Sequence, residues 1–206
     1  MIAEERASLL ETFESLTAAE WETPSLCPGW TVRQVLGHLI ISADPPMGRF
    51  TVAVARARGS FDIANARLAI VEAERPMGEL IERYWDRASK QFSPPGIGPR
   101  GPLSDILLHS LDVRIPLGLA SDRPAVRYQP ALELLFTRRA QVGFVPKRRP
   151  ALRWVATDHD WSHGSGAEVM GTMADLALAA SGRSARLDAL IGPGQPSLVA
   201  WLDPSA

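Results

Sequence analysis

The chain has 206 residues, a formal net charge of −1 and ordinary fractions of hydrophobic (46%) and charged (22%) residues. This balance excludes a disordered or fibrous chain, and the small net charge gives no reason to expect nucleic acid or an anionic membrane surface as a partner. The single cysteine, Cys27, excludes an internal disulfide and favours a cytoplasmic location. No apolar run approaches the roughly 20 residues that span a bilayer. We therefore expect a cytoplasmic globular protein, with its oligomeric state left open.

Hydrophobic spacing predicts a series of helices over the first part of the chain. Thr31 is placed to cap the second of them, and Pro76 is expected to break the fourth. The predicted helices cover residues 2–16, 32–43, 50–58, 65–91 and 102–114. The helical pattern of residues 50–58 is the weaker one, and the spacing of the other four helices indicates an antiparallel four-helix bundle spanning residues 1–118.

The sequence pattern changes after Gly118. The predicted elements beyond it are a strand over residues 152–157, a helix from Val169 to Ala180, a strand over 187–191 and a helix over 196–202. Residues 119–206 are therefore predicted to form a small α/β domain. The expected fold is mainly α, with the bundle first and the α/β domain after it.

Three polar residues stand among apolar neighbours on the predicted helices. His38 lies at the edge of an apolar stripe, while Asp105 and His109 are four residues apart and project from one helix face. An acid and an imidazole at this spacing can hold one cation, and a third ligand from a second helix leaves an open coordination position. The alternatives are a boundary histidine at position 38 and a solvated pair at 105 and 109. Leucines surround that pair so widely that we expect a buried helix, where an aspartate needs a partner.

Two longer motifs resemble a known family. The segment from Trp21 to Leu39, WETPSLCPGWTVRQVLGHL, is similar to the N-terminal motif of the mycothiol-dependent maleylpyruvate isomerase family, a group of DinB-like metal-binding four-helix bundles. The segment from Asp105 to Gly118, DILLHSLDVRIPLG, resembles that family's E-x-x-x-H segment followed by D-I-R-x-P-L-G. Residues 156–162 more weakly resemble the small domain that often follows the bundle.

The resemblance implies one divalent metal, usually zinc, held by His38, His109 and Asp105. Asp105 stands where the family usually has glutamate, so its carboxylate is one methylene shorter. The family's open metal position is associated with the thiol of mycothiol as cosubstrate. The implied function is a thiol-dependent isomerase or transferase acting on a small molecule, with its catalytic residues unknown. The alternative is a bundle that binds a metal or small ligand without catalysis.

Some charged residues near these motifs have open roles. Asp112 lies one turn beyond His109, so it is a candidate to orient that ring, or it pairs with Arg114. For Asp112 and Arg114 alike, we favour a structural role. Arg49, Arg100 and Arg114 are candidate cations for a dicarboxylate substrate, but we interpret each as a surface or structural arginine.

We assign no function to the remaining cysteine and histidine side chains. Cys27 lies in a proline-rich turn with no predicted basic neighbour, which favours a small packed residue over a reactive thiol. His159 and His163, together with Asp158 and Asp160, are interpreted as solvated loop residues rather than a separate metal site.

Overall fold

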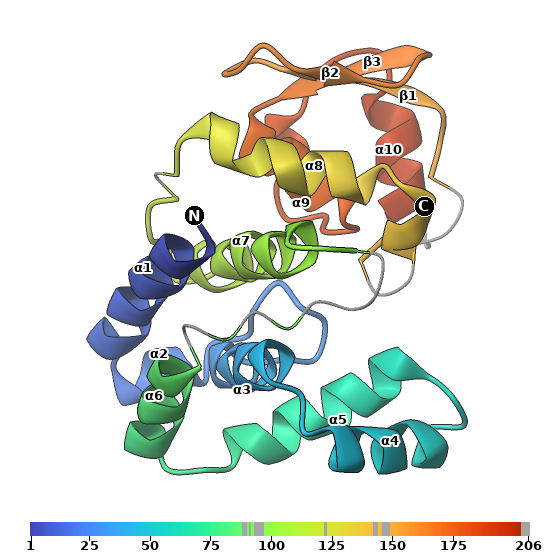
Figure 1. Cartoon of the computed structure of the whole chain (residues 1–206). Helices are drawn as coiled ribbons and strands as arrows, with labels where there is room; N and C mark the ends of the chain where they lie inside the picture. Colours follow the sequence, from blue (N-terminus) through green and yellow to red (C-terminus); the bar gives the residue numbers. More distant parts are fainter. Residues whose placement is uncertain are drawn as a thin grey trace. The chain divides into compact units, whose positions relative to one another are not determined.

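The computed structural model describes residues 1–87, 90, 92, 97–121, 123–141, 144–145 and 149–202. Its internal contacts divide the chain into two compact units, Met1–Ser121 and Asp122–Ala206. The first unit is helical, and the second combines helices with a small three-stranded sheet (Figure 1). The prediction of a mainly α fold with a small C-terminal α/β part is therefore confirmed. Within these ranges, the helices include none that is both long enough and apolar enough to cross a membrane.

The first unit contains each of the predicted helices. Its elements are α1 (Ile2–Ser15), α2 (Ala18–Trp21), α3 (Val32–Ala43), α4 (Met47–Arg56), α5 (Phe61–Ala73), α6 (Met77–Asp86) and α7 (Arg100–Arg114). The predicted break at Pro76 is confirmed, because it separates α5 from α6. The predicted continuation of that helix to residue 91 is wrong, because α6 ends at Asp86 and residues 87 and 90 are not helical; residues 88, 89 and 91 lie outside the described residues. The short α2 was not predicted, although Thr17 and Glu20 form its capping box.

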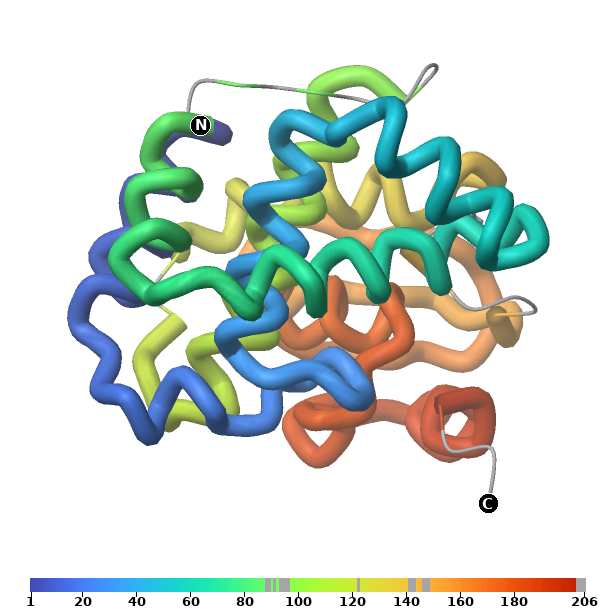
Figure 2. Tube along the Cα trace, turned by 90° about the horizontal axis from the view of Figure 1, so that it is seen from below, coloured from blue at the N-terminus to red at the C-terminus, as the bar shows by residue number. Residues whose placement is uncertain are grey.

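Helix α3 is the centre of this unit. It packs against α5, α6 and α7, and α5 runs close beside it (Figure 2). Its apolar stripe is buried, with Val35 and Leu36 fully enclosed. Each such side chain contributes about 1.5–3 kcal/mol when removed from water. Most of the positions along α7 are buried as well, as the wide apolar arc predicted.

The second unit is built around the sheet. Its elements are η1 (Ala125–Tyr128), α8 (Gln129–Leu135), η2 (Arg138–Gln141), β1 (Leu152–Ala156), β2 (Ser162–His163), β3 (Ala167–Gly171), α9 (Met173–Ala180), η3 (Leu187–Ala189) and α10 (Gln195–Leu202). The strand order is β2-β1-β3, with β1 antiparallel to β2 and parallel to β3.

Two predictions for this unit were wrong. Val169, predicted to be helical, lies in β3 opposite Trp154, and the helix begins only after the Thr172 cap. The segment predicted as a strand over residues 187–191 is a 3-10 turn, and of its residues Ile191 alone forms a bridge, to Met170. Short apolar runs do not distinguish strand from helix by periodicity, which explains both errors.

Candidate metal centre

The structure brings His38, Asp105 and His109 together. His38 comes from α3, and the other two residues come from α7. Asp105 Oδ1 lies 3.1 Å from His38 Nε2 and 3.4 Å from His109 Nε2. The two imidazole rings are 4.6 Å apart, and the histidines are only 6% and 8% exposed. Two ring nitrogens thus face one carboxylate oxygen, and all three candidate ligand atoms lie within 4.8 Å of one another.

The local sequence explains why these side chains meet. Asp105 and His109 are one turn apart on α7 and share a face. Gly37 precedes His38 on α3, and a Cβ there would lie 2.5 Å from the backbone oxygen of Ala69 on α5. A glycine at this position therefore lets α3 approach its neighbour closely, and this approach fixes where His38 lies.

Burial is the largest single influence on the pKa of Asp105 and of His109, but charges and hydrogen bonds together outweigh it. Burial would raise the pKa of Asp105, but the charges and hydrogen bonds of His38 and His109 outweigh it and hold that pKa well below its usual range. Burial would lower the pKa of His109, yet Cys27, Asp105 and Asp112 together raise it well above its usual value. The cluster therefore favours an ionised carboxylate beside a positively charged imidazole.

The outer atoms of the three side chains are also held. Asp112, which is fully buried, places Oδ2 2.8 Å from His109 Nδ1. Ser42 Oγ donates to Asp105 Oδ2 at 2.9 Å. The Asn65 amide lies 3.1 Å from His38 Nδ1. These contacts hold the inner atoms Nε2 and Oδ1 facing one another.

Ser42 and Asn65 were not identified from the sequence. Ser42 lies four residues after His38 on α3, so helical spacing already placed it on the same face. Asn65 comes from α5, and its approach depends on how two helices pack, for which the sequence carries no local signal.

The interpretation of Cys27 as a residue without a basic neighbour is corrected by the structure. Its Sγ lies 3.6 Å from His109 Nδ1 and 3.1 Å from Asp112 Oδ2, to which the thiol donates. The turn carrying Cys27 is closed by a bridge between Pro24 and Thr31, and Leu26 donates its backbone N–H to the Asp112 carbonyl. This fold-back places the thiol against α7, which spacing along the chain could not reveal.

Trp30, at the end of the same turn, covers the histidines. Its ring centroid is 5.4 Å from that of His38 and 6.4 Å from that of His109. The indole is half-buried and lies against both rings of the cluster. Arg114, in contrast, contacts Ser8 and the Ala120 carbonyl.

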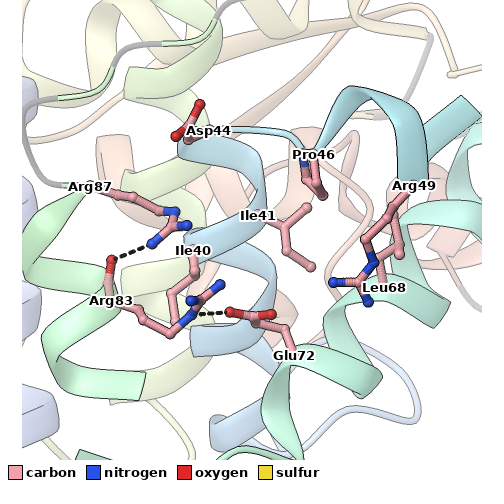
Figure 3. Close-up of a pocket in the computed structure, with 9 residues that line it drawn as sticks. All are labelled: Ile40, Ile41, Asp44, Pro46, Arg49, Leu68, Glu72, Arg83 and Arg87. Carbon is pink, nitrogen blue, oxygen red and sulfur yellow. Dashed lines mark hydrogen bonds and ion pairs between the residues drawn. The ribbon is translucent and has the colours of Figure 1, made fainter. Parts of the chain in front are cut away.

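A separate small pocket lies along α3, away from the cluster. Figure 3 shows its lining residues: Ile40, Ile41, Asp44, Pro46, Arg49, Leu68, Glu72, Arg83 and Arg87. Buried Glu72 pairs with both Arg75 and Arg83, which accounts for its charge. The lining includes Arg49, a candidate cation from the sequence, but none of the three predicted metal ligands.

The fold and the cluster define a mainly helical protein in which two helices bring two imidazoles and a carboxylate together. Residues 2–114 match the family model described as the mycothiol maleylpyruvate isomerase N-terminal domain, and the chain belongs to that family. The fold resembles the crystal structure of a mycothiol-dependent maleylpyruvate isomerase, with a TM-score of 0.65 and 14% identity over 94% of this chain and 91% of that one. A histidine-to-alanine variant of that isomerase gives a TM-score of 0.65 at 13% identity, with the same coverage of both chains. No curated protein sequence matches the chain significantly.

Proposed function

We propose that His38, Asp105 and His109 hold one divalent cation, most simply zinc. The observation that carries the proposal is the convergence of two Nε2 atoms on one carboxylate oxygen, at 3.1 and 3.4 Å. Two imidazole nitrogens and a carboxylate oxygen are a donor set that suits zinc. Without a cation, the inner atoms of the cluster, Nε2 of both rings and Oδ1 of Asp105, face one another. All three residues belong to the proposed metal-binding domain, residues 1–118.

The surrounding residues support this donor set. A carboxylate that accepts from one ring nitrogen of a histidine directs the other nitrogen outward as a ligand. Asp112 has that relation to His109. Ser42 occupies the far oxygen of Asp105 and leaves Oδ1 directed at the histidines.

The proposed activity is that of a thiol-dependent isomerase or transferase acting on a small molecule, with mycothiol as the thiol. Three protein donors leave a coordination position open to a further ligand. A divalent cation held there would stabilise the thiolate form of a thiol at neutral pH. Trp30 limits water at the cluster, and Asp112 keeps His109 in one orientation. Family membership and the shared fold support this reaction class.

The metal is tested by elemental analysis of the purified chain, where we expect close to one zinc per chain. Cobalt replacement then tests the thiol, because a cobalt–thiolate contact gives a charge-transfer band when mycothiol is added. Turnover of cis-unsaturated diacids with and without mycothiol tests the reaction. A metal-loaded chain with no band and no turnover would favour the alternative of a non-catalytic metal-binding protein.

A further inference from the structure

We propose that Asn65 is a positioning residue that fixes which nitrogen of His38 faces the cation, an inference that rests on the metal centre proposed above. Its amide lies 3.1 Å from His38 Nδ1, while His38 Nε2 lies 3.1 Å from Asp105 Oδ1. A ring held at both nitrogens cannot turn without losing both contacts. Asn65 therefore acts on the cation through His38, from a helix that carries none of the three proposed ligands.

The packing of α5 on α3 delivers this contact. Ala69, whose backbone oxygen closely approaches Gly37, lies four residues after Asn65 on α5. Residues four apart share a helix face, so Asn65 must also face α3, one turn nearer the start of α5. His38, next to Gly37, is the side chain that it meets.

An amide suits this position because it can donate or accept. When the single proton of neutral His38 is on Nε2, the ring donates to Asp105 and Nδ1 accepts from the Asn65 N–H. When Nε2 is a ligand, the proton is on Nδ1 and needs an acceptor, which Asn65 Oδ1 provides once the amide turns by half a rotation. Asp112 offers His109 only an acceptor when ionised. The two proposed ligand histidines are thus held by partners of different chemistry.

The test compares the zinc affinities of variants of the full-length chain, measured by competition with a chromophoric chelator. Asn65→Leu removes the partner of Nδ1, and we expect zinc affinity to fall roughly 10- to 100-fold. Asn65→Asp restores an acceptor and should bind zinc at least as tightly as the unmodified chain. Arg67→Leu, at an exposed position on the same helix, is the matched control and should leave the affinity unchanged.

The outcomes separate the two proposals. If the unmodified chain binds no zinc, the metal centre itself is overturned. If the unmodified chain binds zinc and Asn65→Leu binds equally tightly with the same cobalt absorption spectrum, only the role of Asn65 is overturned.

A second measurement needs no variant. Asn65 is the only asparagine in the sequence, so 15N-asparagine labelling gives a single side-chain amide signal. We expect that signal to shift when zinc is added, because the amide exchanges its donor for its acceptor. An unchanged signal at saturating zinc would overturn the inference even if Asn65→Leu failed to fold.

Discussion

The four histidines of the chain form two pairs with contrasting surroundings. His38 and His109 direct ring nitrogens at a shared carboxylate, and a partner holds the opposite nitrogen of each ring. In the second unit, His159 contacts the Gln129 amide oxygen, and the His163 ring lies 4.2 Å from that of Phe136. Burial and the nearby charge of Arg149 lower the pKa of His163. What distinguishes the two candidate ligands from the partly buried His159 and the exposed His163 is therefore the chemistry at the two ring nitrogens.

The largest expected effect comes from removing single rings. His38→Ala and His109→Ala each leave two protein donors, too few to hold a divalent ion firmly, so both should purify with little or no metal. His159→Ala and His163→Ala should keep the metal content of the unmodified chain. Elemental analysis of the four variants tests the contrast directly. Full metal occupancy in His38→Ala would show that His38 is not a metal ligand, as we expect of His159 and His163.

A smaller effect on zinc affinity is expected from substitutions of Asp105. Asp105→Ala removes a charged donor but leaves both imidazoles, so zinc affinity should fall less completely than in the histidine variants. Asp105→Glu should retain the metal or bind it more tightly, because it restores the residue that is usual in the family. Chelator competition measures both. Loss of zinc from Asp105→Glu would show that the shorter side chain is required by the present helix spacing.

The smallest expected effect is on thermal stability. A ligand present at about 100 times its Kd stabilises the folded state by about 2.7 kcal/mol. For a chain of about 200 residues this corresponds to a Tm roughly 5–10 °C higher. Chelation should therefore lower the Tm of the unmodified chain and of His163→Ala, and leave that of His38→Ala unchanged. Equal sensitivity to chelator in His38→Ala would indicate stabilisation by metal bound elsewhere.

How much could be predicted from the sequence depended on whether a signal was local. The pairing of Asp105 with His109 follows from helical spacing, and the stop at Pro76 follows from the missing N–H of proline. The pair and the break could both be identified from residues that are close together in the sequence. The wide apolar arc also predicted correctly that α7 is buried.

Features that depend on distant segments were missed. The contact between Cys27 and Asp112 joins residues 85 positions apart, through a turn whose closure cannot be inferred from composition. The strand at Val169 depends on pairing with β1, which overrides the local helical pattern. The sequence thus indicated the residues that face one another across α3 and α7 and, of the residues behind them, Asp112, but not Ser42, Asn65 or Cys27.

Gly37 couples the distance between α3 and α5 to the position of His38. A methyl group at this position would meet the Ala69 oxygen at 2.5 Å, so any larger residue must push α3 away from α5. The same displacement would move His38, the next residue, and so change its distances from both Asn65 and Asp105. The distance between α3 and α5 and the position of His38 therefore cannot be changed independently. Any substitution that alters the contact between Gly37 and Ala69 would also alter the arrangement of His38, Asp105 and His109.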